Sequence, residues 1–378
     1  MQAEVPQRTG GALWIGILVG LAAILLVWVV RYSERQLDDE RLLDESIYLA
    51  AFEALAAGTS PYAVDGYLYP PAFAHAGVAL ASLISLDGVW LFLRIFNQLG
   101  LLVILWATVR WAEDAGARIR YRHWALLGVV LALSNGVFVA VICGNVSFLA
   151  GGLLMLGLAA SGKRPFVAGL LLALSVSIKP YAAPAVLVLA VAGWRNRGKA
   201  WLGSSLTALA LGFSFSLPSP WLGDMLRAAP SHLVEIRSAS LYRIGLLAGV
   251  DLSRFIWLGL ALAVLAAFAW RWAERPLIVR ALCLFGVLAM PVVWNHTLVL
   301  LFPVVAAAWV MAARRRETAP RERWIPWIAG LCVWGFESGS VDLLPRLPQA
   351  VLLSVPWIVG FGLLAYLLHA EGGTKQTA

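Results

Sequence analysis

The sequence predicts an all-α integral membrane protein, and both its composition and its apolar runs support this. Hydrophobic residues make up 61% of the 378-residue chain and charged residues 13%, and the mean hydropathy is +0.80, which excludes a water-soluble globular protein. Apolar runs of about 15 to 20 residues recur along the chain, and a helix needs roughly 20 residues to cross a bilayer core of about 30 Å. Because no stretch is long and polar enough for a soluble domain, we expect residues 1–378 to form a single polytopic membrane domain.

About twelve transmembrane helices are expected, counted from the apolar runs and the loops between them. The expected spans are residues 12–30, 89–110, 124–142, 146–160, 166–178, 181–194, 200–217, 254–273, 278–294, 297–313, 324–337 and 350–369. The first run lacks a small-residue cleavage signature, so we interpret it as a retained span. Residues 71–86 are apolar but short and would disturb the parity of the crossings. We therefore expect them to form an interfacial or re-entrant helix at the outer face.

Positive charge gathers in alternate loops and indicates the orientation. The basic loops lie at residues 110–122, 163–164, 195–199, 271–280 and 314–323. Since cytoplasmic loops retain Lys and Arg, we expect these loops and both termini to lie in the cytoplasm. We expect the membrane to be the plasma (inner) membrane. The formal net charge of +8 then faces anionic membrane lipids. No basic and aromatic platform indicates a nucleic-acid partner.

The first long outer loop, residues 31–86, contains the densest group of acidic residues. Residues 31–70 hold eight acidic residues and three arginines, a pattern also typical of a solvated translocated loop. Within it, residues 44–57 show helical periodicity, and Asp44 falls at or near the N-terminus of that helix. Asp44 is then either an N-cap or a carboxylate that the helix dipole helps to keep ionised, as a catalytic base requires.

Cations also occur on the side that short translocated loops normally keep free of them. The second long outer loop, residues 218–253, holds Arg237 and Arg243, whose guanidinium groups suit a phosphate or pair with nearby acids and lipid headgroups. Lys179 and His296 interrupt apolar sequence at outer helix ends. Ionisable groups there are costly unless they have a role or extend to the interface, so both are candidate site residues.

Several motifs follow one another in a characteristic order along the chain. They are Asp44-x-x-x-Tyr48, Gly58-x-x-Pro61-Tyr62, Tyr69-Pro70-Pro71, Gly144-Asn145, Lys179 at a span end, and Trp294-Asn295-His296. In this order they resemble the landmarks of glycosyltransferase family 87 in the GT-C superfamily. The best-known members of that family are polyprenol-phosphate-mannose-dependent mannosyltransferases that act on phosphatidylinositol mannosides. The resemblance implies a GT-C-type helical bundle with interfacial helices on its outer face.

The resemblance also implies a reaction: inverting transfer of a sugar, with mannose the best single choice, from a polyprenyl-phosphate donor to a hydroxyl acceptor on the outer face. Asp44 would be the general base, because a positioned carboxylate can take the acceptor proton. The donor phosphate would be bound by His296, Lys179, Arg237 and Arg243. The sugar or acceptor pocket would contain Glu45, Tyr48, Tyr62, Tyr69, Asn145 and Asn295. The acceptor is a glycolipid, a polysaccharide or a protein.

No cofactor is expected, since the sequence lacks a phosphate-binding glycine loop and an H-E-x-x-H metal motif. A divalent cation among the acidic residues of the first outer loop is compatible with the sequence, but the spacing does not require one. The three cysteines lie far apart in apolar segments and predict no disulfide. No predicted metal ligand set therefore competes with a lipid-linked donor.

Other function classes stay open. A transporter or flippase of lipid-linked sugars would have a similar number of spans, but its ion-coupled forms usually carry carboxylates inside the bilayer, and the predicted spans hold none in their interiors. A non-catalytic assembly subunit would tolerate replacement of Asp44. If the chain is an enzyme, arabinofuranosyl transfer is the main alternative to mannosyl transfer.

Overall fold

The computed structural model describes residues 43–216, 219–225, 227, 238–290, 293, 295–315, 324–335 and 346–374. Within these residues the secondary structure consists of α-helices and short 3-10 turns without a strand, which confirms the all-α prediction. The expected first span at residues 12–30 lies outside the described residues, as do the acidic residues that precede Leu43.

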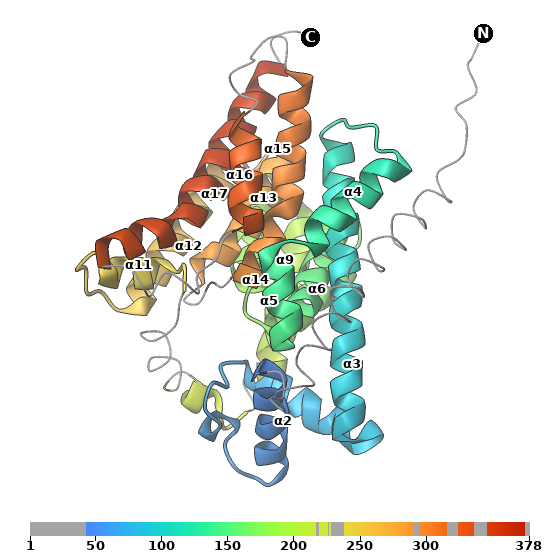
Figure 1. The fold of residues 1–378 in the computed structure, drawn as a ribbon, viewed down its shortest axis with the longest axis vertical. Helices are drawn as coiled ribbons and strands as arrows, with labels where there is room; N and C mark the ends of the chain where they lie inside the picture. The colour runs from blue at the N-terminus through green and yellow to red at the C-terminus, as the bar shows by residue number, and fades with distance from the viewer. Residues whose placement is uncertain are drawn as a thin grey trace.

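The longest helix, α3 (Pro71–Asp114), runs from the end of the molecule that carries α2 (Leu43–Ala56) to the opposite end (Figure 1). Its middle packs against α6 (Ser147–Ala160). The two backbones approach so closely that a Cβ on Gly100 would lie 2.0 Å from the Phe148 carbonyl oxygen. Because only glycine permits this approach, it determines how α3 and α6 cross.

A break at Ser85 divides α3 into two arms. Ser85 has φ 69° and ψ 166°, outside the helical region, and its hydroxyl accepts a hydrogen bond from the Gly88 backbone N–H at 3.3 Å. The break separates residues 71–84 from residues 86–114. The expected boundary between a short outer helix and a span is therefore present, as a kink within one helix.

Most other helices lie where the apolar runs predicted them. They are α7 (Pro165–Ile178), α8 (Ala182–Arg195), α9 (Lys199–Ser216), α12 (Arg254–Arg271), α16 (Trp324–Gly335) and α17 (Arg346–Thr374). A short helix, α11 (Leu241–Leu247), belongs to the second long outer loop. Apolar periodicity predicts these helices well because each buries one apolar face against its neighbours.

Three expected spans are broken in the structure. Residues 124–142 are divided between α4 (Tyr121–Ala132) and α5 (Asn135–Cys143), which meet at 56°. The expected span 278–294 contains α13 (Pro276–Phe285) and the 3-10 turn η2 (Gly286–Ala289). The expected span 297–313 contains α14 (Asn295–Leu298), the 3-10 turn η3 (Val299–Leu301) and α15 (Phe302–Arg314). Hydropathy indicates which residues are buried and does not detect a break in a helix. It stays high across a break when the freed backbone polar groups form hydrogen bonds inside the protein.

The number of crossings stays a prediction. Among the described residues, four helices are long and apolar enough to cross a membrane, or five if α4 and α5 form one bent span. The four are Pro71–Asp114, Arg254–Arg271, His296–Arg314 and Pro348–Ala370. The other apolar helices have 10 to 17 residues, which is short for a bilayer core of about 30 Å. The expected count of about twelve is not confirmed.

The basic loops gather at one end of the molecule, which we call the basic end. Polar contacts join these loops and the adjoining helix ends: Arg314 to the Ala115 carbonyl at 3.2 Å, Arg280 to Asp114 at 2.9 Å, Asn196 to the Ala273 carbonyl at 3.0 Å, and Ser204 to the Ser161 carbonyl at 3.3 Å. Helices α6, α7 and α8 each start or finish at this end. Their other termini therefore point away from the basic end, toward α2 (Figure 1).

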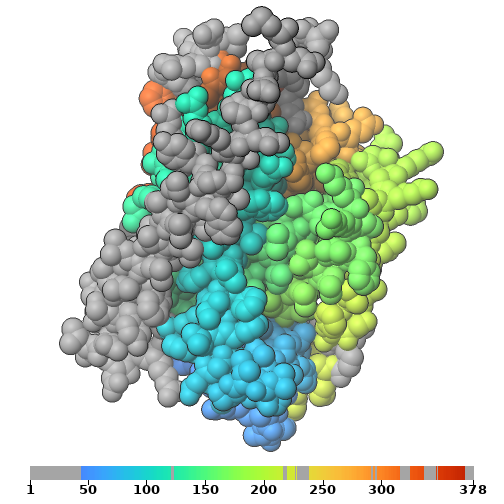
Figure 2. All heavy atoms as spheres, turned by 90° about the vertical axis from the view of Figure 1, so that its right-hand side faces the viewer, coloured from blue at the N-terminus to red at the C-terminus, as the bar shows by residue number. Residues whose placement is uncertain are grey.

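A separate aromatic cluster holds α2 at that opposite end. The Tyr48 ring meets the rings of Tyr69 and Phe73 edge to face, with centroids 4.8 Å and 5.5 Å apart. Phe52 also packs on Phe73. Figure 2 shows α2 and the loop after it in blue, against the first arm of α3. Edge-to-face pairs contribute about 0.5–1.5 kcal/mol each beyond their buried area, so the cluster orients α2 firmly.

Candidate active site

Asp44 lies in the first turn of α2, which confirms the predicted helix and its start. The carboxylate is not an N-cap of this helix, because the helix already includes Leu43. Partly exposed, Asp44 faces inward from the aromatic cluster and binds a side chain from another element. A carboxylate in the first turn also interacts favourably with the helix dipole.

A chain of hydrogen bonds joins Asp44 to two tyrosines. Asn145 Nδ2 donates to Asp44 Oδ2 at 2.6 Å and to the Tyr69 hydroxyl at 3.3 Å. The Tyr69 and Tyr48 hydroxyls are 2.6 Å apart. These four predicted site residues come from three separate segments, and the fold brings them together. In the described part of the chain Asp44 makes no other side-chain hydrogen bond, which leaves Oδ1 open to an incoming hydroxyl.

Asn145 is positioned by the tight junction between α5 and α6. Gly144 ends α5 with φ 67°, the left-handed conformation that favours glycine at this position. A Cβ on Gly144 would lie 2.2 Å from Cγ of Glu45. Asn97 caps the start of α6, with Oδ1 2.9 Å from the backbone N–H groups of Phe148 and of residue 149. The junction therefore presents a fully buried Asn145 side chain to α2.

Lys179 ends α7 and is buried, with 3% of its surface exposed. Its ammonium donates to Asn145 Oδ1 at 2.7 Å, to the Ser147 hydroxyl at 3.0 Å and to the Tyr181 hydroxyl at 3.3 Å. A buried ammonium is tolerated only when oxygens replace its water shell, and these three do so. Lys179 is thus part of the same cluster as Asp44, joined through Asn145.

His296 and Thr297 complete the cluster from α14. The Thr297 hydroxyl donates to the Tyr181 hydroxyl at 3.1 Å, and His296 is buried within electrostatic reach of Lys179. Sequence reasoning missed Ser147, Tyr181 and Thr297. Each is one or two residues from a position that it did single out, so the local motifs contained the signal.

Two predicted pocket residues have structural partners instead of facing Asp44. Glu45 forms a two-armed ion pair with Arg94, at 2.6 Å and 2.7 Å, and accepts a third hydrogen bond from Trp90 at 2.8 Å. Tyr62 donates to the Tyr69 carbonyl oxygen at 2.7 Å, so it supports the pocket from behind. Both residues hold the site in place from outside the hydrogen-bond chain.

The remaining predicted residues are less closely connected to the cluster. Arg243 lies in α11, a short helix that belongs to the second long outer loop. Arg237 lies outside the described residues, and the side chain of Asn295 is not described although its backbone starts α14. The described residues contain no group of three or more His, Cys, Asp or Glu side chains that could hold a metal ion. The expectation that no cofactor is needed stays a prediction.

Burial shapes the protonation of the outer-loop groups. It raises the pKa of the Asp44 carboxyl above its ordinary value, although the Lys179 charge and the Asn145 hydrogen bond lower that pKa. Burial also raises the pKa values of Tyr48 and Tyr69 well above the ordinary value. Both tyrosines therefore stay protonated and can donate, while Asp44 is a stronger proton acceptor than an exposed aspartate.

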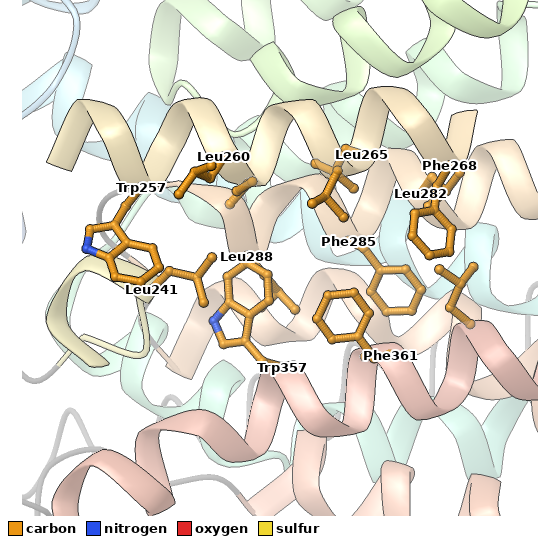
Figure 3. Close-up of a pocket in the computed structure, with 15 residues that line it drawn as sticks. Leu241, Trp257, Leu260, Leu265, Phe268, Leu282, Phe285, Leu288, Trp357 and Phe361 are labelled. Carbon is orange, nitrogen blue, oxygen red and sulfur yellow. The ribbon is translucent and has the colours of Figure 1, made fainter. Parts of the chain in front are cut away.

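An apolar groove lies beside α12 and α17. It has a volume of about 240 Å³ and is walled by side chains of α11, α12, α13, η2 and α17. Figure 3 shows Trp257, Leu288, Trp357 and Phe361 lining it. Trp357 donates to the Ala239 carbonyl at 2.9 Å, which ties the groove wall to the second outer loop.

That loop also contacts the segment between the groove and His296. The Ala239 backbone N–H donates to the Val293 carbonyl at 2.9 Å, and the Val293 N–H donates to the Ser238 hydroxyl at 2.9 Å. Because η2 lines the groove and α14 carries His296, residue 293 bridges the two. In the sequence, a lining element of the groove, η2, is therefore followed within a few residues by the helix that carries His296.

Comparison with known proteins relates this arrangement to one family. The model of glycosyltransferase family 87 matches residues 67–293, more than half of the chain; Asp44 precedes this match and His296 follows it. The chain is also 29% identical over 235 residues to the polyprenol-phosphate-mannose-dependent alpha-(1-2)-phosphatidylinositol mannoside mannosyltransferase of Mycobacterium tuberculosis. That alignment covers 57% of this chain and 53% of the relative, so the chain spans about half the length of the protein that it matches. The chain belongs to glycosyltransferase family 87, a family of membrane glycosyltransferases.

Proposed function

We propose that this protein transfers a sugar from a polyprenyl-phosphate donor to a hydroxyl acceptor, with inversion at the anomeric carbon and with Asp44 as general base. The observation that supports the proposal best is the position of the Asp44 carboxylate. Asp44 is held by Asn145 through Oδ2 alone among the described residues, beside a buried polar cluster and next to a family match that begins at residue 67.

The chemistry requires one base. As the acceptor oxygen bonds to the anomeric carbon, Asp44 Oδ1 takes its proton, and the polyprenyl phosphate leaves with the electron pair of the broken bond. Burial raises the pKa of Asp44, and a higher pKa strengthens the carboxylate as a base. The neighbouring Glu45 is occupied by Arg94, so a single direct displacement, which inverts the configuration, fits these carboxylates better than a two-step reaction.

A lipid-linked donor fits the apolar groove. An isoprenoid chain is apolar along its whole length, and the groove beside α12 and α17 is lined by apolar side chains. We propose that the isoprenoid chain of the donor lies in this groove. The donor phosphate would then lie near His296, in the helix that follows the groove-lining turn η2 in the sequence. Arg243 in α11, and Arg237 beyond the described residues, stay candidates for the same phosphate because guanidinium groups bind phosphate well.

The sugar and the acceptor are proposed from the relative. Its name specifies polyprenol-phosphate-mannose as donor and a phosphatidylinositol mannoside as acceptor, so mannose and a glycolipid are the first choices for this chain. Arabinofuranosyl transfer, and a polysaccharide or protein acceptor, are the alternatives to be tested beside them. Tyr48 and Tyr69 border the site with protonated hydroxyls that suit sugar hydroxyls.

The position of the basic end indicates on which face of the membrane the proposed transfer takes place. If that end faces the cytoplasm, as the charge rule predicts, Asp44 lies toward the periplasmic or extracellular face, and both termini are cytoplasmic. The site is also recessed. Asn97, which caps α6 beside Asn145, lies about 18 Å along α3 from the kink at Ser85, at 1.5 Å per residue. A sugar carried on a membrane lipid reaches such a depth easily.

The decisive experiment is sugar transfer by purified protein in nanodiscs. Polyprenyl-phosphate mannose, arabinose and other sugars are offered with a membrane-extract acceptor, and wild type is compared with Asp44→Asn. The matched control is Asp87→Asn, the same change at an exposed position of α3. We expect transfer from one donor, a loss of roughly 10²-fold or more in Asp44→Asn and none in the control.

Two outcomes would contradict the proposal. Absence of transfer from every donor, together with uptake or flipping of a lipid-linked sugar in proteoliposomes, would establish the transporter. Full activity of folded Asp44→Asn would remove Asp44 from the reaction and favour an assembly role.

A further inference from the structure

The orientation of the Asn145 amide is determined by the groups around it. Its Oδ1 receives hydrogen bonds from Lys179 Nζ at 2.7 Å, from the Ser147 backbone N–H at 3.0 Å and from the Ser147 hydroxyl at 2.6 Å. An ammonium and a backbone N–H only donate, so the atom facing them must be the amide oxygen. The amide nitrogen therefore points the other way, where its two hydrogens meet Asp44 and Tyr69.

The Lys179 ammonium has three N–H donors, and three oxygens of the protein face it. These are Asn145 Oδ1, the Ser147 hydroxyl and the Tyr181 hydroxyl, at 2.7 Å to 3.3 Å. A phosphate oxygen would have to displace one of them from a side chain that is 3% exposed. The charge acts instead on Asn145 Oδ1, and this polarises the amide so that its nitrogen donates more strongly to Asp44.

We propose that Asn145 is the positioning residue of the Asp44 base, and that Lys179 acts on this base through the Asn145 amide and not on the donor phosphate. The inference rests on the proposed function, since it assigns a role beside the base of that reaction. The amide holds Oδ2, so Oδ1 keeps one direction toward the acceptor. Lys179 and Ser147 fix the orientation of the Asn145 amide so that its nitrogen, and not its oxygen, faces Asp44 Oδ2.

The proposal makes a prediction about charge. Among the described residues, the titratable groups that interact electrostatically with Asp44 are Glu45 and Tyr48 from α2, Tyr69 from the segment before α3, and Lys179 from the junction of α7 and α8. Lys179 is the cation among them and lowers the pKa of Asp44, whereas Glu45 raises it. Removing the Lys179 charge, or the amide, therefore raises that pKa.

The first test reads Asp44 without catalysis. A water-soluble carbodiimide with an amine modifies protonated carboxyl groups, and peptide mass spectrometry gives the extent at Asp44 against pH in the full-length protein. We expect the midpoint to rise by roughly one pH unit in Lys179→Met and in Asn145→Leu, as for loss of a nearby opposite charge or hydrogen bond. Lys163→Met, an exposed lysine at the basic end, is the matched control and leaves the midpoint unchanged. An unchanged midpoint in folded Lys179→Met overturns the proposal.

The second test separates the base from the donor. In Lys179→Met we expect the acid limb of the kcat profile to move to higher pH, in the direction that the Asp44 midpoint moves, with the donor KM within about twofold of wild type. A higher donor KM at every pH, with the acid limb unmoved, would show that Lys179 binds the phosphate and would overturn the proposal.

A further variant covers a failure of folding. Ser147→Ala removes one hydrogen bond to Asn145 Oδ1 and one acceptor of Lys179. We expect a smaller shift of the Asp44 midpoint in the same direction, and no shift would count against the proposal. If wild type transfers no sugar, the proposed function fails, while the labelling experiment still decides whether Asn145 and Lys179 control Asp44.

Discussion

Asp44 is governed at the residue scale by opposing influences on one carboxyl group. Burial raises its pKa, and Lys179 and Asn145 lower it without cancelling the effect of burial. Tyr48 and Tyr69 add two protonated hydroxyls to the same network. The result is a basic carboxylate that Asn145 holds through one oxygen, next to two protonated tyrosine hydroxyls of the same network.

The pH dependence of transfer follows from that raised pKa. Only ionised Asp44 can accept a proton, so kcat/KM falls as pH decreases through its pKa, which lies above the ordinary value of 3.8. We expect an acid limb above pH 4 in wild type and the same limb in Asp87→Asn. A rate measured from pH 4 to 8 that stays flat would contradict the assignment of Asp44 as base.

Tyr69→Phe tests the hydrogen-bond chain. The change removes the hydroxyl that contacts both Tyr48 and Asn145, while the ring can keep its place in the aromatic cluster. We expect kcat to fall roughly fivefold to thirtyfold, as for the loss of one or two neutral hydrogen bonds of about 1 kcal/mol each. Tyr67→Phe in the same cluster is the control, since its hydroxyl makes no hydrogen bond to these residues. Equal kinetics of the two variants would exclude a role for the Tyr69 hydroxyl.

The elements meet at the site through their ends. α2 is held by the aromatic cluster on one side and by the ion pair of Glu45 with Arg94 on the other. The junction of α5 and α6 presents Asn145, and the end of α7 presents Lys179. Helix ends carry unpaired backbone groups and allow sharp turns, so four segments can bring polar side chains to one place.

Gly144→Ala tests the junction of α5 and α6. A Cβ would force a left-handed conformation on alanine and would meet Glu45 at 2.2 Å. We expect a loss of at least about 1 kcal/mol of stability, seen as a lower melting temperature in detergent. Gly212→Ala in α9 is the matched control, with no atom within 4 Å of the added Cβ, and should raise stability by up to about 1 kcal/mol. A Gly144→Ala variant as stable as wild type would refute the packing argument.

The ion pair of Glu45 and Arg94 is testable by a double-mutant cycle. Their side chains are 10% and 15% exposed, so removal of one partner leaves a nearly buried charge. We expect Arg94→Met and Glu45→Gln each to lower the free energy of unfolding of the protein by about 3 kcal/mol or more. The double variant should lower it by less than the sum of the two single effects. The ion pair of Arg110 and Glu113, which is more exposed, provides the control cycle with a small coupling. Additive effects at Glu45 and Arg94 would show that they do not act as a pair.

The whole molecule places two unlike environments at one site. The basic end lies opposite α2, and the apolar groove of Figure 3 lies beside α12 and α17, with η2, which precedes the helix of His296 in the sequence, in its wall. A lipid-linked donor needs both an apolar track for its chain and a polar cluster for its sugar and phosphate. This pairing distinguishes the proposed transfer from the use of a soluble nucleotide sugar.

Gly360→Trp tests the track. Gly360 lines the groove, where an added Cβ would lie 3.3 Å from Leu288 and Phe285, so a tryptophan narrows the groove. We expect the KM of a long-chain donor to rise about tenfold, with little change for a short-chain analogue. Gly330→Trp is the matched control, because Gly330 lines a second apolar cavity of about 420 Å³ between α4, α15 and α16. Equal effects on both donors would place the chain elsewhere.

The sequence alone was sufficient for the helical class, for most helix positions and for several residues of the cluster, although not for Ser147, Tyr181 and Thr297. Apolar periodicity marks helices because burial of one face is a local property, and Asp44, Asn145, Lys179 and His296 stood out as polar groups at apolar helix ends. The break between α4 and α5 escaped prediction, since residues on both sides of Ser134 remain apolar.

Only the tertiary structure decided which of those residues act together. Glu45 and Asp44 are neighbours in the chain, yet Glu45 pairs with Arg94 and Asp44 with Asn145, because successive helical side chains point about 100° apart and meet different elements. Lys179 looked like a phosphate ligand from its place at a helix end, but its donors meet three oxygens of the protein. Periodicity determines which face of a helix is buried. Hydrogen-bond partners depend on distances across the fold, which no local pattern contains.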